Sequence, residues 1–192
     1  DFATVFEKAR YYAFQNQADI GRELLRKYLD KKGPDASAAE WTNFAQYLVG
    51  TGQNEQAETA IHKALQLEDP ENPVATRFHA QWLLRNNQTE TAINKYRELF
   101  DKTGEPGALM NLAEAQLQAQ KYDAALSTIS KYQQDNPATA QMYFIQARAE
   151  IATEKYKQAR ETLTKSLQLA PNQPTPYYLR AKLDLNAPAQ SK

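Results

Sequence analysis

Side chains that could do chemistry are few in this chain and stand apart. It has two histidines, His62 and His79, and neither is followed by a metal ligand at i+4. It has no cysteine, which excludes disulfides, thiolate metal sites and a cysteine nucleophile. No serine stands in a Gly-x-Ser-x-Gly context. The sequence therefore predicts no catalytic site, no metal site and no cofactor.

Two further motifs resemble chemical sites but are explained by turns. Gly50 and Gly52 look like the start of a phosphate-binding loop, but Glu55 takes the place of the third glycine and no strand precedes it. We interpret this segment as a turn between two helices. Glu68 and Asp69 lie in another turn, beside Pro70, and we expect both carboxylates to be solvated there.

The elements that must position these residues are helices. Trp41, Phe44, Ala45 and Leu48 fall at i, i+3, i+4 and i+7, which places them on one face of a helix. A turn follows, then a second amphipathic helix that ends before a proline. This two-helix unit recurs, and we expect eleven helices within a single domain covering residues 1–192. The repeat units are predicted at about 2–35, 38–72, 73–105, 106–138 and 139–173, with a cap helix at 174–187.

Alanine marks the period of these units. It returns about every 34 residues on the first helix and again on the second. The first series is Ala45, Ala80, Ala113 and Ala147, and the second is Ala57, Ala92, Ala125 and Ala159. A small residue at both positions lets the two helices of a unit cross closely, where a larger one would overpack the contact. An earlier, looser copy aligns on Gly21.

The intervals resemble the tetratricopeptide repeat over nearly the whole chain. The second unit carries the pattern most fully, in the order Trp41, Phe44, Ala45, Leu48, Ala57, Ile61, Ala64 and then Pro70. The resemblance implies an all-α, right-handed superhelical array of antiparallel helix pairs, with about five repeats and a C-terminal capping helix. It also implies a protein-interaction module and not an enzyme. His79 takes a position that the family gives to leucine, so we expect it to pack.

The resemblance also predicts contact residues, because in related proteins the first helices line a concave groove. Transferred by register, the positions one turn apart on those helices, with neighbouring positions added, form the predicted partner-binding set: Phe6, Arg10, Thr42, Gln46, Val49, Arg77, Gln81, Met110, Asn111, Glu114, Leu117, Phe144, Arg148, Ile151, Tyr178 and Lys182. Apolar anchors would supply binding energy, and polar donors would hold a peptide backbone or carboxylate. Because the register positions hold four basic side chains and one acidic side chain, we expect a modest preference for acidic or C-terminal segments.

Composition narrows the class of partner. The chain balances 23 basic against 23 acidic residues, with a pI near 7.0. A nucleic-acid or anionic-membrane binder needs a basic excess, so neither partner is expected. No apolar run approaches the roughly 20 residues that span a bilayer, so we expect no direct membrane insertion. A protein or peptide partner remains.

Location follows only from weaker signals. The chain starts at Asp1 without methionine, which we interpret as a processed protein or an excised fragment. The absence of cysteine and the many Gln, Asn and Thr residues favour the periplasm of a bacterium, within an envelope assembly for polysaccharide export, pilus formation or secretion. The alternative is a cytoplasmic chaperone or regulator that shields a hydrophobic partner helix. Such a protein should show a wider apolar stripe than Phe6, Met110, Phe144 and Tyr178 provide.

Overall fold

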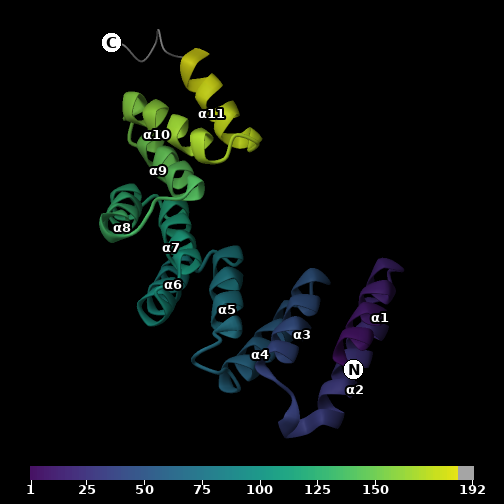
Figure 1. The fold of residues 1–192 in the computed structure, drawn as a ribbon. Coiled ribbons are helices and arrows are strands. Elements are labelled where there is room, and N and C mark those ends of the chain that lie inside the picture. Colours follow the sequence, from purple (N-terminus) through teal and green to yellow (C-terminus); the bar gives the residue numbers. More distant parts are fainter. Residues whose placement is uncertain (186–192) are drawn as a thin grey trace. The chain divides into compact units, whose positions relative to one another are not determined.

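The computed structural model describes residues 1–185, and these residues form eleven α-helices and one short 3₁₀ turn, without strands. The all-α prediction of paired helices is confirmed (Figure 1). The helices are α1 (Phe2–Phe14), α2 (Ala18–Lys32), α3 (Ala38–Gly50), α4 (Asn54–Gln66), α5 (Val74–Arg85), α6 (Thr89–Thr103), α7 (Pro106–Gln118), α8 (Tyr122–Asp135), α9 (Ala140–Ala152), α10 (Tyr156–Leu169) and α11 (Pro174–Leu185), with η1 at Gly33–Asp35. The predicted cap helix corresponds to α11, and its expected positions 186 and 187 lie outside the described residues.

The helices group into two compact units. Unit 1 runs from Asp1 to Trp82, and unit 2 begins at Leu83, within α5. In unit 1, α1 packs on α2 and α3 packs on α4; in unit 2, α7 packs on both α6 and α8, and α10 packs on both α9 and α11. Each unit is therefore a stack of helices joined by short turns. The single domain over residues 1–192 and the right-handed superhelix stay predictions.

The alanine series behave as the sequence predicts. All eight alanines, at positions 45, 80, 113, 147, 57, 92, 125 and 159, have no exposed surface. Ala9 is equally buried in the first pair, and Gly21 faces it on α2. A Cβ at Gly21 would stand only 2.7 Å from the Ala9 carbonyl oxygen. The looser first copy thus has an even tighter helix crossing than an alanine would allow.

The turn inside each pair repeats one backbone conformation. The positive-φ residues are Asn16, Gly52, Asn87, Gln120 and Glu154, with φ between 58° and 79°. In every case the next residue donates its N–H to a carbonyl five positions back, as Lys121 does to Gln116 at 2.8 Å. This closure satisfies carbonyls that the helix end leaves open. Of these five residues, only Gly52 is of the type that adopts a positive φ without strain, and so predicts the conformation from the sequence.

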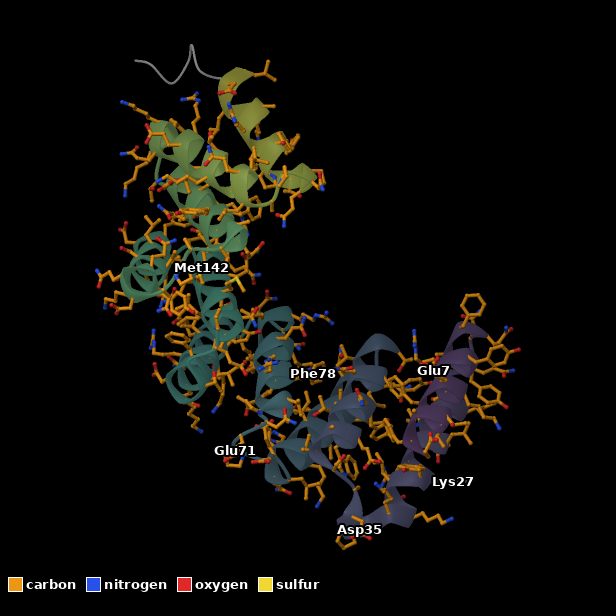
Figure 2. All side chains as sticks on the ribbon, in the orientation of Figure 1. Glu7, Lys27, Asp35, Glu71, Phe78 and Met142 are labelled. Carbon is orange, nitrogen blue, oxygen red and sulfur yellow. The ribbon has the colours of Figure 1, made fainter. Side chains whose placement is uncertain are left out.

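The core of unit 2 lies between α7, α8 and α9. Leu109, Ile129, Met142 and Ile145 are at most 1% exposed there. Met142 is labelled in Figure 2. Two polar residues, Gln116 and Glu150, occupy equivalent buried positions and find partners. The Gln116 Oε1 atom accepts a hydrogen bond from Thr128 at 3.0 Å, and the Glu150 Oε1 atom accepts one from Gln146 at 2.8 Å.

Among the described helices, none combines the length and the hydrophobicity that a membrane crossing requires.

Candidate functional site

Two adjoining hollows lie along the first helices of unit 1. The first, which we name the α1–α3 hollow, has a volume of about 280 Å³. Its lining comes from α1 and from the C-terminal half of α3 with the residue that follows it: Phe6, Arg10, Ala13, Gln46, Tyr47, Gly50 and Thr51. Three of the predicted contact residues therefore come together here.

The second, the α3–α5 hollow, is also about 280 Å³ in volume. It is lined by Ala39, Thr42, Asn43, Gln46, Val74, Arg77, Phe78 and Gln81, and Phe78 is labelled on α5 in Figure 2. Gln46 lines both hollows, so the two adjoin at this residue of α3. Unit 1 thus places six residues of the predicted set around these two hollows: Phe6, Arg10, Thr42, Gln46, Arg77 and Gln81.

A capping box fixes the start of α3. Ser37 Oγ accepts the Glu40 N–H at 3.2 Å, and the Glu40 carboxylate accepts the Ser37 N–H at 2.9 Å. Lys32 also donates to Glu40, at 2.9 Å. Burial acts to raise the pKa of Glu40, but the hydrogen bonds from Ser37 and Lys32 outweigh it, so the pKa of this carboxyl lies below its ordinary value. The same hydrogen bond between Lys32 and Glu40 raises the pKa of Lys32 above its ordinary value.

Glu68 holds the start of α5, and this corrects the prediction that it is solvated. Its Oε1 atom accepts the backbone N–H groups of Ala75 and Thr76, the latter at 2.9 Å, and its Oε2 atom accepts the Thr76 hydroxyl. A carboxylate at this place satisfies open N–H groups and faces the positive end of the helix dipole. The turn residue Glu68 therefore positions the helix that carries Arg77 and Gln81.

In unit 2, three predicted residues form one contact group across α7 and α9. Arg148 Nη1 lies 2.8 Å from Glu114 Oε1, and the Arg148 guanidinium lies 5.7 Å from the centre of the Phe144 ring. Both charged side chains are about two-thirds buried. Since their charges compensate each other, Arg148 is not the open cation that the sequence argument expects.

The same correction applies to Arg10, whose guanidinium donates to Glu7 at 2.8 Å. Thr42 also directs its donor inward, to the Ala38 carbonyl at 2.8 Å. At least two of the four cations behind the expected preference for acidic segments, Arg10 and Arg148, are thus already paired. The lining of unit 1 is better described as amide-rich than as basic.

The remaining predicted residues of unit 2 differ in exposure. Met110 is half-buried against the core of α7, α8 and α9, and Asn111 is half-buried beside it in sequence. Leu117 is only 8% exposed, and Ile151 is half-buried against a core cluster; ligand contact at these two positions stays a prediction. Tyr178 and Lys182 lie exposed on α11. Val49 is half-buried on α3.

Several lining residues were missed by the sequence argument. It placed contacts one turn apart, at Thr42 and Gln46, and overlooked Ala39 and Asn43, which complete the i, i+3, i+4, i+7 face of α3. The predicted set also leaves out Phe78, which packs, at 9% exposure, and forms a wall of the α3–α5 hollow. Full use of the helical period would have found all three.

The histidines lie closer than their sequence separation suggests. The ring centres of His62 and His79 are 6.1 Å apart, and His79 also lies 6.2 Å from Trp82. His79 is half-buried, in keeping with the packing role expected for it. Within residues 1–185 no three His, Cys, Asp or Glu side chains gather in a way that could hold a metal ion.

The repeat geometry has a counterpart among protein families. The family model described as "Anaphase-promoting complex, cyclosome, subunit 3" matches residues 50–132 and again residues 85–166. The two matches are displaced by one helix pair, so the model recognises the repeat itself. Together they cover more than half of the 192 residues. No curated protein sequence matches the chain.

Solved structures share the architecture at low sequence identity. A tetratricopeptide repeat protein from Parabacteroides merdae is 20% identical, with a TM-score of 0.75 over 95% of this chain and 72% of that one. YrrB, described as a tetratricopeptide repeat protein with an unusual peptide-binding site, is 16% identical, with a TM-score of 0.65 over 94% and 92%. Pseudomonas aeruginosa pilF is 15% identical, with a TM-score of 0.63 over 95% and 82%. At these identities the likeness concerns the fold.

Fold and hollows together define the class of protein: an α-solenoid of helix pairs, the architecture of a protein–protein interaction scaffold. The chain belongs to the tetratricopeptide repeat family.

Proposed function

We propose that this chain is a non-enzymatic scaffold that binds an extended segment of a partner protein across the first helices of unit 1. The observation that carries the proposal is that the α1–α3 and α3–α5 hollows adjoin at Gln46, along the first helices of three successive pairs. A site formed by α1, α3 and α5, the first helices of three successive pairs, suits an extended peptide that runs across them. It does not suit a compact substrate, which would need an enclosed pocket.

The chemistry of the lining favours a peptide backbone as the ligand. Asn43, Gln46 and Gln81 each offer an amide donor and an amide acceptor. These match the N–H and C=O groups that every residue of an extended peptide presents. Phe6 and Phe78 supply apolar walls at which partner side chains can anchor.

The alternative, a chaperone that shields a hydrophobic helix, finds less support in this lining. Such a ligand needs a continuous apolar stripe. The two hollows instead alternate apolar walls with Gln, Asn and Arg side chains. The peptide selection described below also tests this alternative, because a chaperone of this kind would select peptides with amphipathic helical periodicity.

We further propose a bacterial envelope assembly in the periplasm as the setting. The support is compositional: no cysteine, balanced charge and many Gln, Asn and Thr residues. Expression of the natural gene in its host, followed by cell fractionation, tests this part directly; recovery in the cytoplasm would contradict it.

The binding experiment uses peptides selected from a displayed library of random dodecapeptides on the whole chain. Gln46→Ala removes the amide shared by both hollows, and the proposal expects selected peptides to lose affinity by about tenfold, as for a central contact. Gln66→Ala, an exposed glutamine near the end of α4, is the matched control and should leave affinity unchanged. Peptides that bind the Gln46 variant as well as they bind the wild type would contradict the proposal.

A further inference from the structure

A hollow of unit 2 lies on its second helices, away from the predicted contact residues. It has a volume of about 410 Å³, and we name it the α6–α8 groove. Its lining residues are Arg97, Phe100 and Asp101 from α6, Leu109 and Leu112 from α7, and Thr128, Lys131, Tyr132, Asp135 and Asn136 from α8 and the residue after it. None of these belongs to the predicted partner-binding set.

The floor and walls of the groove are apolar. Leu109 and Leu112 form the floor, with only 1% and 4% of their surface exposed. Phe100 and Tyr132 stand on the two walls with their rings edge to face, 6.0 Å between centres. Aromatic walls over an aliphatic floor are suited to an apolar anchor from a partner.

The charges along the groove are ordered. The short connections before and after α7 make α6 and α8 both run opposite to it, and hence in the same direction. Arg97 precedes Asp101 by one turn on α6, and Lys131 precedes Asp135 by one turn on α8. The groove therefore has a basic end and an acidic end, about 6 Å apart along the helix axes.

The two carboxylates at the acidic end are not compensated within the described part of unit 2. The ion pairs recorded there join other residues: Lys95 with Glu98, Lys121 with Glu90, Arg148 with Glu114, and Arg160 with Asp184. Asp101 lies in the last turn of α6, and Asp135 is the last residue of α8. Acidic groups are unfavourable at the negative end of a helix dipole, so a cation between them would be stabilised by both carboxylates and both helix ends.

Unit 1 has a groove in the same register that lacks this acidic end. It lies between α2 and α4 over Trp41 and Phe44, with a volume of about 250 Å³. Asp30 stands where α6 has Asp101, but it lies 3.7 Å from Arg26 of its own helix. The α4 wall contributes Gln56, Thr59 and Ala60, none of them acidic. The acidic end is therefore particular to unit 2 and not a consequence of the repeat.

We propose that the α6–α8 groove is a second protein-interaction surface, which takes a partner segment with an apolar anchor beside a lysine or arginine. The anchor lies against the edge-to-face pair of Phe100 and Tyr132, over the apolar floor of the groove, and the basic head group lies between Asp101 and Asp135. The apolar stem of a lysine or arginine can cover the aromatic rings on its way to the carboxylates, and its charge is attracted to their faces. An acidic residue of the partner would meet Arg97 and Lys131 at the other end.

The test selects random dodecapeptides on the whole chain and compares wild type with the double variant Asp101→Lys and Asp135→Lys. The single variant Asp101→Lys is tested beside the double variant, and Asp30→Lys is its matched control, because it makes the same change of about two charge units at the equivalent position of unit 1. We expect a class of peptides that wild type and control bind alike and that the double variant binds at least about tenfold more weakly, with affinity rising as salt falls. These peptides should share an apolar residue near a lysine or arginine.

Two results would overturn the proposal. One is that no selected peptide distinguishes wild type from the double variant. The other is that the peptides which do distinguish them lack a basic residue. The neutral pair Asp101→Asn and Asp135→Asn guards against misfolding, since it removes only the charges and should weaken the same peptides. Peptides held by the hollows of unit 1 are recognised by their dependence on Gln46, so the two surfaces can fail separately.

Discussion

The hydroxyl oxygen of Tyr47 lies 2.2 Å from the place where a Cβ on Gly21 would stand. The same hydroxyl donates a hydrogen bond to the Ala18 carbonyl at 2.7 Å. Burial at this contact raises the pKa of Tyr47. A tyrosine of α3 is thus fixed to the backbone of α2 at the point where α2 lacks a side chain, and this contact joins the first helix pair to the second.

We therefore expect Gly21→Ala to destabilise unit 1, by about 1–3 kcal/mol, as overpacking of a close contact does. Addition of Tyr47→Phe should relieve only part of this, because the Ala9 carbonyl oxygen would still lie 2.7 Å from the new Cβ. Urea unfolding followed by circular dichroism measures both effects. A Gly21→Ala protein as stable as wild type would show that α1, α2 and α3 separate more freely than the contact implies.

The positive-φ turns of unit 2 give a prediction of the opposite sign. Gln120 and Glu154 have φ of 58° and 61°, where a side chain with a Cβ is strained. Gln120→Gly and Glu154→Gly should each stabilise the protein by about 0.5–1 kcal/mol. Asn87→Gly is the comparison and should gain less, because asparagine tolerates this conformation. The melting temperatures of the three variants, each compared with wild type, rank the stabilisation.

Glu68 offers a test of how α5 is positioned. Glu68→Ala removes the acceptor for two backbone N–H groups and for the Thr76 hydroxyl, so we expect a loss of about 1–2 kcal/mol. Glu68→Gln keeps an acceptor and should lose less. Amide hydrogen exchange at Ala75 and Thr76 reports the opening of this turn. Unchanged protection in the alanine variant would contradict the capping role.

The capping box of α3 makes stability depend on pH. The folded-state pKa of Glu40 lies below its ordinary value of 4.5, so the carboxylate stabilises the fold above that pH and the contribution is lost as the pH falls through the lower, folded-state pKa. Glu40→Gln should therefore be less stable than wild type at neutral pH, and the difference should shrink in acid. Denaturant unfolding at a series of acidic pH values measures it. A constant difference across the series would rule out Glu40 as the titrating group.

The sequence predicts those features that depend on period. The two alanine series identify both helices of each pair, because a close crossing admits only a small residue and the requirement recurs in every repeat. The contacts of unit 1 follow from the same register, and Arg77 and Gln81 were found in this way. Periodicity applied more fully would also have found Asn43.

Features that depend on long-range partners could not be predicted in this way. Glu68 resembles any solvated turn residue until α5 is placed over it. In the sequence Arg148 resembles an unpaired cation, because its partner Glu114 lies one repeat earlier and is brought beside it only by the fold. From the sequence alone, Arg148→Glu would be expected to leave stability unchanged. Because the substitution places a second carboxylate beside Glu114, we expect it also to lower the free energy of unfolding. The acidic end of the α6–α8 groove likewise appears only when α6 and α8 lie on the same side of α7.

The most direct test of the account is where a peptide binds. The chain is labelled with ¹⁵N and titrated with the tightest peptide selected on it whose affinity depends on Gln46. The account predicts that the largest chemical-shift changes fall on the side-chain amides of Asn43, Gln46 and Gln81 and on the backbone of α1 and α3. Changes confined to α2 and α4, with these three amides unmoved, would contradict it.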